Sequence, residues 1–254
     1  MKNDLSDVSF LIALKVDSND RVNNLDITID YLNHYFDTEI IICEQGPVPV
    51  LENRYSSCKY VFHQIDEFFN RQKGVNIAAR HSTKPFIAHY DADILLEPEQ
   101  ITKTVDALRS KEVEFVLPYN GHFYDVPKQF HAQIADTKTL TGFTVNDCEL
   151  FTVRGVGGVV FFDRNVFWKN GGANENFKGL GYEDNEIFDR FRILKTKMAR
   201  INKPLFHLNH VRKETSYNYN PFVKDNEREY VRVVSMSYEE LKNEISNWTW
   251  TNVS

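Results

Sequence analysis

The first half of the chain alternates short apolar runs with amphipathic stretches, and this alternation restricts the fold more than any other feature. Runs rich in β-branched and aromatic residues predict strands at residues 8–16, 39–43, 60–62, 86–90 and 113–117. Between them, apolar residues three and four positions apart predict a helix that Asn19 or Asp20 caps and whose apolar face extends to Phe36, and helices that begin near Gly74 and at Pro98. Strands that alternate with helices predict an α/β fold with a mostly parallel sheet, whose ligands bind beyond the carboxyl ends of the strands.

The second half of the chain is less regular. We expect strands at residues 158–162 and 205–208, a short helix capped by Asp163, and a helix over residues 183–194. Ser237 and Glu240 form a capping-box pattern before a final helix. Since there is no internal repeat or obvious linker, we expect a single domain over residues 1–254.

Composition excludes several classes of protein. The net charge of −6 argues against a general nucleic-acid binder, which would need a basic surface. The chain has no apolar run long enough to span a bilayer, and residues 1–7 carry no signal-peptide pattern. Three widely spaced cysteines predict no disulfide framework, so we expect a cytoplasmic protein. Trp248 and Trp250 would suit peripheral contact with a membrane, although packing against the domain is the simpler interpretation.

Asp91 and Asp93 follow the apolar strand predicted at residues 86–90. Residues two apart on an extended chain point to the same side, so both carboxylates would be presented at the carboxyl end of a strand. A divalent cation bound with a diphosphate would explain this pairing, because Mg²⁺ and Mn²⁺ prefer oxygen ligands. The simpler alternative is a solvated turn, since such a pair of aspartates also occurs by chance.

His207 and His210 lie at the end of the strand predicted over residues 205–208. One histidine is more often structural than a ligand, but two of them could complete a metal site if the fold brings them to Asp93. Imidazole together with carboxylate favours Mn²⁺ over Mg²⁺.

Acidic residues follow a glycine-rich segment at residues 179–186. Capping of the predicted helix near its positive dipole end would account for one or two of these acids. The functional alternative is a general base, a carboxylate within hydrogen-bond reach of an acceptor hydroxyl.

These segments, in this order, resemble the beta-1,4-galactosyltransferase family and related GT-A enzymes, including bacterial chondroitin-polymerase-type transferases. Residues 69–76 resemble the family's FNRxxxxN segment and residues 91–93 its DxD motif. Residues 157–158, 171–172 and 179–184 resemble its GG…NGF…GWGGED stretch, and residues 207–210 with Arg212, Asn220 and Pro221 resemble its MxxHSR…NP segment. The resemblance runs from about Arg21 to Phe222. It implies a GT-A fold, a Rossmann-like sheet flanked by helices with an acceptor-binding C-terminal half.

The resemblance also implies roles for individual residues. Asp93 and His210 would bind Mn²⁺ or Mg²⁺, with His207 in place of the methionine ligand of the animal enzymes. Asp184 would be the catalytic base, and Glu183 would orient the acceptor. The remaining substrate-binding residues would be Arg21, Glu44, Phe69, Arg71, Asp91, Ala92, Gly158 and Tyr182. Leu180 and Tyr182 depart from the family, which has tryptophan and glycine there, so the identity of the two sugars stays open.

The function implied is metal-dependent, inverting transfer of galactose or N-acetylgalactosamine from a UDP-sugar to a carbohydrate acceptor, which could be lipid-linked, in surface polysaccharide or lipopolysaccharide synthesis. Residues 1–96 would bind the nucleotide sugar, residues 97–220 the acceptor and metal, and residues 221–254 would form a helical extension. The alternatives are a retaining UDP-sugar transferase, a metal-dependent nucleotidyltransferase or phosphohydrolase, and a sugar-binding module without activity. Retaining polypeptide N-acetylgalactosaminyltransferases carry Glu-Asn where this chain has Glu183-Asp184.

Overall fold

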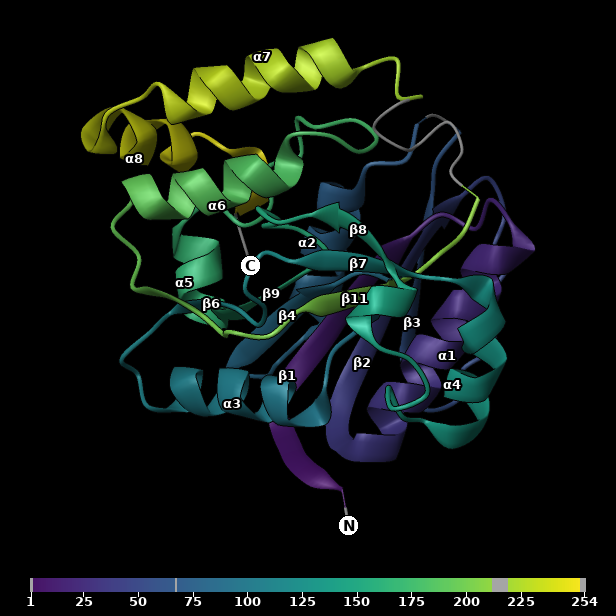
Figure 1. The fold of residues 1–254 in the computed structure, drawn as a ribbon. Coiled ribbons are helices and arrows are strands. Elements are labelled where there is room, and N and C mark those ends of the chain that lie inside the picture. The colour runs from purple at the N-terminus through teal and green to yellow at the C-terminus, as the bar shows by residue number, and fades with distance from the viewer. Residues whose placement is uncertain (1, 67, 212–218, 252–254) are drawn as a thin grey trace.

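A seven-stranded sheet forms the centre of the protein, in a computed structural model that describes residues 2–66, 68–211 and 219–251 (Figure 1). The strand order is β10-β6-β9-β4-β1-β2-β3. All neighbouring strands run parallel except β9, which is antiparallel to both β4 and β6. This confirms the predicted α/β fold with a mostly parallel sheet. The strands are β1 (Asn3–Leu14), β2 (Phe36–Gly46), β3 (Lys59–Gln64), β4 (Phe86–Tyr90), β6 (Phe115–Leu117), β9 (Val159–Asp163) and β10 (Met198–Arg200).

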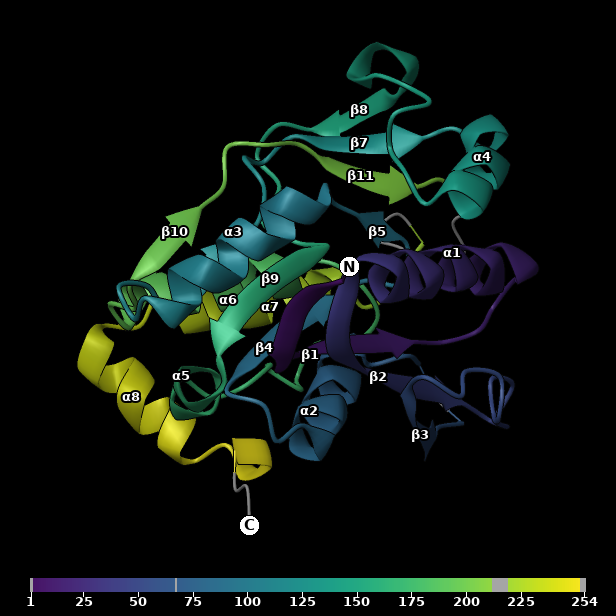
Figure 2. The same cartoon turned by 90° about the horizontal axis from the view of Figure 1, so that it is seen from below.

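Helices cover both faces of this sheet. Helices α1 (Asn19–Tyr35) and α3 (Pro98–Arg109) lie on one face and α2 (Arg71–His81) lies on the other (Figure 2). The central strands are therefore buried on both sides, which explains why residues 8–14 of β1 form a nearly unbroken apolar run. Ser18, rather than Asn19 or Asp20, caps α1, and Phe36 begins β2 instead of extending the apolar face of that helix.

A second sheet of four strands was not predicted. It has the order β5-β11-β7-β8 and consists of β5 (Ile94–Leu95), β7 (Phe123–Val126), β8 (Glu149–Thr152) and β11 (Leu205–Leu208). The only part of it expected from the sequence is β11. Leu95, Val126, Phe206 and Leu208 of this sheet pack against α4 (His131–Thr137) and part of α1 in a cluster separate from the main core.

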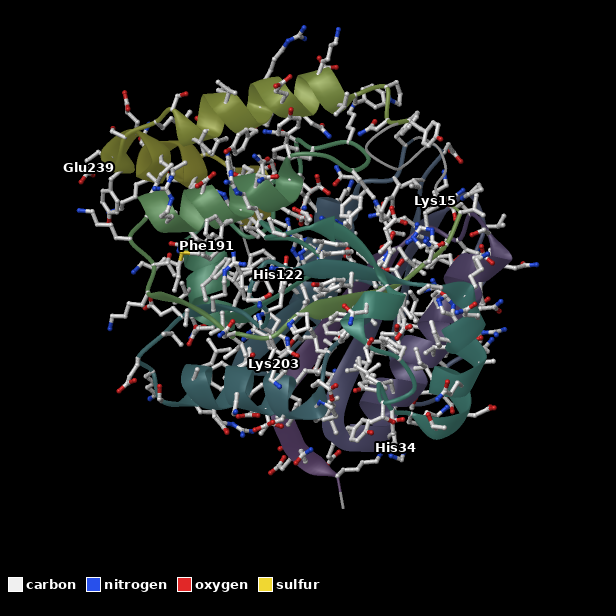
Figure 3. All side chains as sticks on the ribbon, viewed as in Figure 1. Lys15, His34, His122, Phe191, Lys203 and Glu239 are labelled. Carbon is white, nitrogen blue, oxygen red and sulfur yellow. The ribbon has the colours of Figure 1, made fainter. Side chains whose placement is uncertain are left out.

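The remaining helices lie at one end of the main sheet. They are α5 (Arg164–Lys169), α6 (Glu183–Ile193), α7 (Val223–Val234) and α8 (Tyr238–Ser246). Short 3₁₀ turns occur before α4 at Lys128–Phe130, before β8 at Val145–Asp147 and after α8 at Thr249–Thr251. Asp163 caps α5 and the Ser237–Glu240 capping box begins α8, as predicted. Figure 3 shows Phe191 of α6 inside the body of the protein and Glu239 of α8 at its outer edge.

The two C-terminal tryptophans are engaged by the protein. Trp248 is only 5% exposed and packs with Val233, Leu241 and Ile245, while the indole N–H of Trp250 donates to the Gly171 carbonyl. Trp248 therefore serves packing, and the exposed aromatic pair considered for membrane contact is not formed. In the described part of the chain, every helix is too short or too polar to cross a membrane.

Candidate active site

The candidate site lies beyond the carboxyl ends of β1 and β4, the neighbouring strands at the centre of the main sheet. The chain leaves β1 toward β2 on one side, whereas β4 lies on the other side. Such a switch in direction opens a crevice in α/β sheets, and ligands bind there. Arg21 in the first turn after β1 and Asp91 and Asp93 after β4 are thereby brought to one place.

The register of the second sheet gathers the predicted metal ligands. Ile94 of β5 pairs with His207 of β11, and the N–H of Leu208 donates to the carbonyl of Asp93 (2.8 Å). His207 Nε2 lies 3.5 Å from Asp93 Oδ1, and His210 Nε2 lies 3.2 Å from Asp93 Oδ2. One ligand atom from each of these three residues lies within 4.8 Å of the others. The arrangement can hold a divalent cation.

The other ring nitrogen of each histidine has a partner that fixes the tautomer. His207 Nδ1 lies 2.7 Å from Asp125 Oδ1, and His210 Nδ1 lies 3.0 Å from the Val211 carbonyl. Because a carbonyl and a carboxylate accept hydrogen bonds, each Nδ1 carries a proton, and Nε2 of each ring is directed toward Asp93. Ligands oriented in this way are typical of metal sites. Asp125 is placed beside His207 by the parallel pairing of β7 with β11.

Positive groups surround the Asp93 carboxylate, which is 3% exposed. Burial opposes its ionisation, but His207, His210 and Arg21 outweigh burial and hold the pKa of Asp93 well below its usual range. Arg21 Nη1 lies 3.1 Å from Asp93 Oδ2. Burial likewise opposes protonation of His207, but Asp93 and Asp125 raise its pKa to about 9. The pocket around Asp93 therefore favours positive charge.

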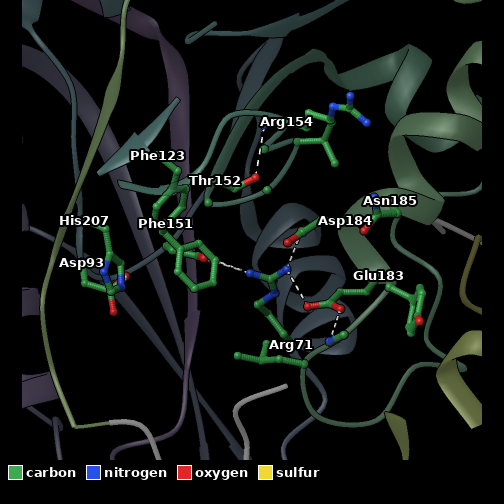
Figure 4. A pocket seen from close by; sticks show the side chains of 18 of the residues that line it. Arg71, Asp93, Phe123, Phe151, Thr152, Arg154, Glu183, Asp184, Asn185 and His207 are labelled. Carbon is green, nitrogen blue, oxygen red and sulfur yellow. Dashed lines mark hydrogen bonds and ion pairs between the residues drawn. The ribbon is translucent and has the colours of Figure 1, made fainter. Parts of the chain in front are cut away.

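A second charged group centres on Arg71, the first residue of α2. Its guanidinium donates to three carboxylates, those of Asp91 (2.9 Å), Glu183 (2.8 Å) and Asp184 (2.5 Å) (Figure 4). Three carboxylates therefore share one guanidinium group. Burial raises the pKa of Glu183 to about 7, although Arg71 lowers it. Burial also raises the pKa of Asp91 to about 6, again against the effect of Arg71.

Asp184 lies in the first turn of α6, opposite the start of β9. The turn before it is tight, because Tyr182 adopts a left-handed conformation with φ of 69° at the beginning of the helix. Gly157 lies against the carboxylate, and a Cβ atom at that position would fall 2.0 Å from Asp184 Oδ2. Gly158 accepts a hydrogen bond from the Asp91 N–H (2.8 Å). The glycine pair therefore holds both acids at the wall of the site.

Both charged groups line one cavity of about 500 Å³. Ten of the predicted site residues line it: Arg21, Arg71, Asp91, Asp93, Gly158, Tyr182, Glu183, Asp184, His207 and His210. Phe69 and Ala92 line a small adjoining cavity, with Ala13, Leu14 and Lys15.

Glu44 and Arg212 stand apart from this group. Glu44 lines neither cavity, and its buried carboxylate accepts hydrogen bonds from the N–H groups of Val50 and Leu51 and from the Tyr60 hydroxyl. Glu44 thus organises the loop after β2. Arg212 lies outside the described residues.

Several residues of the site were not predicted from the sequence. Asp125 orients His207, and Phe151 and Arg154 line the cavity from the segment around β8. Asp125 lies on a short strand without a clear apolar alternation, so no local pattern distinguishes it from a surface acid. Phe151 is 54% exposed in the structure, and no sequence pattern distinguishes it from a core phenylalanine.

Residues 137–214 match the model of a family described as the N-terminal domain of galactosyltransferase. The match covers less than half of the chain and includes the three glycine segments, the Glu183-Asp184 pair and both histidines. A search of curated proteins finds no match.

Solved structures of glycosyltransferases share the fold. The catalytic domain of Drosophila beta-1,4-galactosyltransferase 7, in complex with xylobiose, is 16% identical, with a TM-score of 0.50 over 85% of this chain and 79% of that one. A variant of that enzyme with manganese, UDP-Gal and xylobiose has a TM-score of 0.51 at 16% identity, over 80% and 71% of the two chains. Glucosyl-3-phosphoglycerate synthase from Mycobacterium tuberculosis, with Mn²⁺, UDP and phosphoglyceric acid, has a TM-score of 0.52 at 14% identity, over 90% and 75%. These findings confirm the predicted GT-A fold and the predicted likeness to galactosyltransferases.

Proposed function

We propose that the protein is a Mn²⁺-dependent inverting glycosyltransferase that transfers galactose or N-acetylgalactosamine from a UDP-sugar to a hydroxyl group of a carbohydrate acceptor. The observation that carries this proposal is the presence of two separate groups in one cavity. Asp93, His207 and His210 lie at one end, and Arg71 holds Asp184 at the other. In this proposal residues 1–96 bind most of the nucleotide sugar and residues 97–220 supply the acceptor side.

The ligand atoms fit Mn²⁺. Two imidazole nitrogens and one carboxylate suit this ion, and three protein ligands leave positions for oxygens of a diphosphate. When bound, the ion would neutralise negative charge that develops on the departing UDP. Asp125 and the Val211 carbonyl already hold both imidazoles in the tautomer that such binding needs.

Asp184 would act as the general base. The acceptor oxygen forms a bond to C1 of the donor sugar as the bond from C1 to the diphosphate oxygen breaks, and Asp184 accepts the hydroxyl proton. Attack from the face opposite the leaving diphosphate inverts the configuration at C1. Arg71 holds Asp184 through Oδ1, while Oδ2 lies against Gly157 at the cavity wall. The carboxylate is thus held in a fixed direction before the acceptor arrives.

The test combines a donor screen with one variant. UDP release is measured from UDP-galactose, UDP-N-acetylgalactosamine and UDP-glucose with Mn²⁺ and with EDTA. We expect release that requires Mn²⁺, and we expect Asp184→Asn to retain UDP binding in calorimetry while losing at least about 100-fold in turnover, typical of the loss of a general base. The matched control is Asp189→Asn, in the same helix but outside the cavity, where the carboxylate pairs with Arg192 and accepts a hydrogen bond from the Tyr230 hydroxyl.

Two outcomes would contradict the proposal. Turnover of Asp184→Asn close to that of the unmodified protein would reject the base. Release of pyrophosphate or phosphate instead of UDP would favour a nucleotidyltransferase or phosphohydrolase. The NMR coupling of the anomeric proton in the product distinguishes inversion from retention.

A further inference from the structure

The acceptor end of the cavity carries a positive charge that no carboxylate in the described residues neutralises. Three arginines line the cavity: Arg21, Arg71 and Arg154. Arg21 pairs with Asp93, and Arg71 pairs with three acids. Arg154, between β8 and β9, has no ion pair within residues 2–66, 68–211 and 219–251, and its backbone N–H donates to the Thr152 hydroxyl (3.1 Å).

Arg154 lies on the side of the cavity where an acceptor would enter. In Figure 4 the Asp93 and His207 end lies on one side of Arg71, and Asp184, Asn185 and Arg154 lie on the other. A donor diphosphate bound at the metal end would therefore leave Arg154 near the acceptor rather than near the UDP. Phe151, which contacts Phe123 at 5.5 Å between ring centroids, lines the cavity from β8 on the side of Asp93 and His207.

A second arginine supports this turn of the chain. Arg200 Nη1 donates to the Gly155 carbonyl (3.1 Å), and its guanidinium lies over the Tyr119 ring, 5.7 Å from the centroid. No carboxylate pairs with Arg200 in the part of the chain that the structure describes. Two guanidinium groups thus adjoin residues 154–155, whereas every carboxylate that lines the cavity already has a positive partner.

We propose that the cavity selects acceptors that carry an oxyanion, a carboxylate or a phosphate group, and that Arg154 binds this group as the reacting hydroxyl approaches Asp184. A guanidinium offers a planar set of donors that matches both groups in a bidentate manner. An acceptor that covers Arg154 displaces water, and the lower dielectric strengthens the pairing. The proposal rests on the proposed transferase function and adds the chemical class of its acceptor.

The experiment compares charged and neutral sugars on the protein saturated with UDP and Mn²⁺. Ligand-observed NMR titrations measure the affinity for methyl glucuronide, glucose 6-phosphate and methyl glucoside. We expect the charged sugars to bind at least 10-fold more tightly than methyl glucoside. Whichever of methyl glucuronide and glucose 6-phosphate binds more tightly indicates whether the site prefers a carboxylate or a phosphate group. Arg154→Ala should weaken binding of the charged sugars about 10- to 100-fold, as expected for a charge-assisted hydrogen bond, and change methyl glucoside less than threefold.

Two further variants make the result specific. Arg154→Lys keeps the charge without the bidentate geometry, so its affinity for the charged sugars should lie between those of the unmodified protein and Arg154→Ala. Arg192→Ala removes the same charge from an exposed position outside the cavity and should leave the affinities for all three sugars unchanged. The proposal is overturned if the unmodified protein binds methyl glucoside as tightly as the charged sugars, or if Arg154→Ala weakens all three equally.

Failure of the transferase function would look different. UDP binding with Mn²⁺ and UDP release without acceptor depend on the Asp93 end of the cavity and not on Arg154. The sugar titrations are therefore repeated without UDP and Mn²⁺: absence of UDP binding and release, with discrimination between charged and neutral sugars intact in these titrations, would reject the transferase and leave the oxyanion site. Presence of UDP binding and release without such discrimination would reject the oxyanion site alone.

Discussion

Gly157 places the proposed base by leaving room for it. A Cβ atom there would lie 2.0 Å from Asp184 Oδ2, far inside van der Waals contact, so Gly157→Ala must push the carboxylate aside. We expect turnover to fall about 100-fold, because a displacement of about 1 Å can have that effect, while UDP and Mn²⁺ still bind. Gly46→Ala is the matched control, since its nearest new contact is an ordinary 3.5 Å. Equal turnover in the two variants would show that Asp184 need not occupy its present position.

Asp125 acts on the metal group through His207. Its carboxylate is 6% exposed and lies 2.7 Å from His207 Nδ1, so it fixes the ring and increases the basicity of Nε2. Asp125→Asn keeps a hydrogen-bond acceptor but removes the charge, and we expect about 10-fold weaker Mn²⁺ binding, measured by calorimetry in the presence of UDP. Asp136→Asn, an exposed change on α4, should leave Mn²⁺ affinity unaltered. Unchanged affinity in Asp125→Asn would mean that His207 needs no charged partner.

At the scale of elements, long periodic segments were predictable and short strands were not. Helix α1 and strands β1, β2 and β4 carry clear apolar patterns, whereas β5 has only two residues and β7 and β8 have four each. The second sheet was missed for this reason, and its register is what brings His207 to Asp93. The sequence therefore indicated the three candidate ligands, but the resemblance rather than periodicity was needed to predict that they lie close together.

Helix α6 depends on a buried ion pair for its attachment to the glycine loop before it. Arg190 is 0% exposed, pairs with Glu186 at 2.6 Å, and donates to the carbonyls of Asn170 and Gly172. Arg190→Met leaves the Glu186 carboxylate buried without its partner, which costs about 3–5 kcal/mol of unfolding free energy. Denaturant titration should register this loss, whereas Arg192→Met on the exposed side should stay within about 0.5 kcal/mol. A small effect at Arg190 would indicate that water reaches the pair.

At the scale of the whole molecule, the site concentrates acids that the folded chain must keep close together. Of the four carboxylates that line the cavity, three share Arg71 and one is held by Arg21 and the histidines. Neither the net charge nor the composition predicted such a concentration. It arises because α2, β4 and α6, far apart in sequence, converge at one end of the main sheet. Folding therefore carries an electrostatic cost at this end that depends on pH.

The contribution of Glu183 to this cost can be measured as a change in unfolding free energy with pH. Its ordinary pKa of 4.5 is raised to about 7 by burial, so between these values the folded chain holds a proton that the unfolded chain has released. The unfolding free energy contributed by Glu183 must then fall as pH rises from about 4.5 to about 7. Glu183→Gln removes this dependence while keeping an acceptor for the Gly181 N–H.

We expect the metal-free Glu183→Gln variant to be more stable than the unmodified protein by about 1–3 kcal/mol at pH 8, and close to it near pH 4.5. Denaturant titrations at several pH values measure the difference, and Glu239→Gln on the exposed side of α8 should show none of it. If Glu183→Gln were less stable at pH 8, the pairing of Glu183 with Arg71 would outweigh its burial, and Glu183 would be ionised throughout the neutral range.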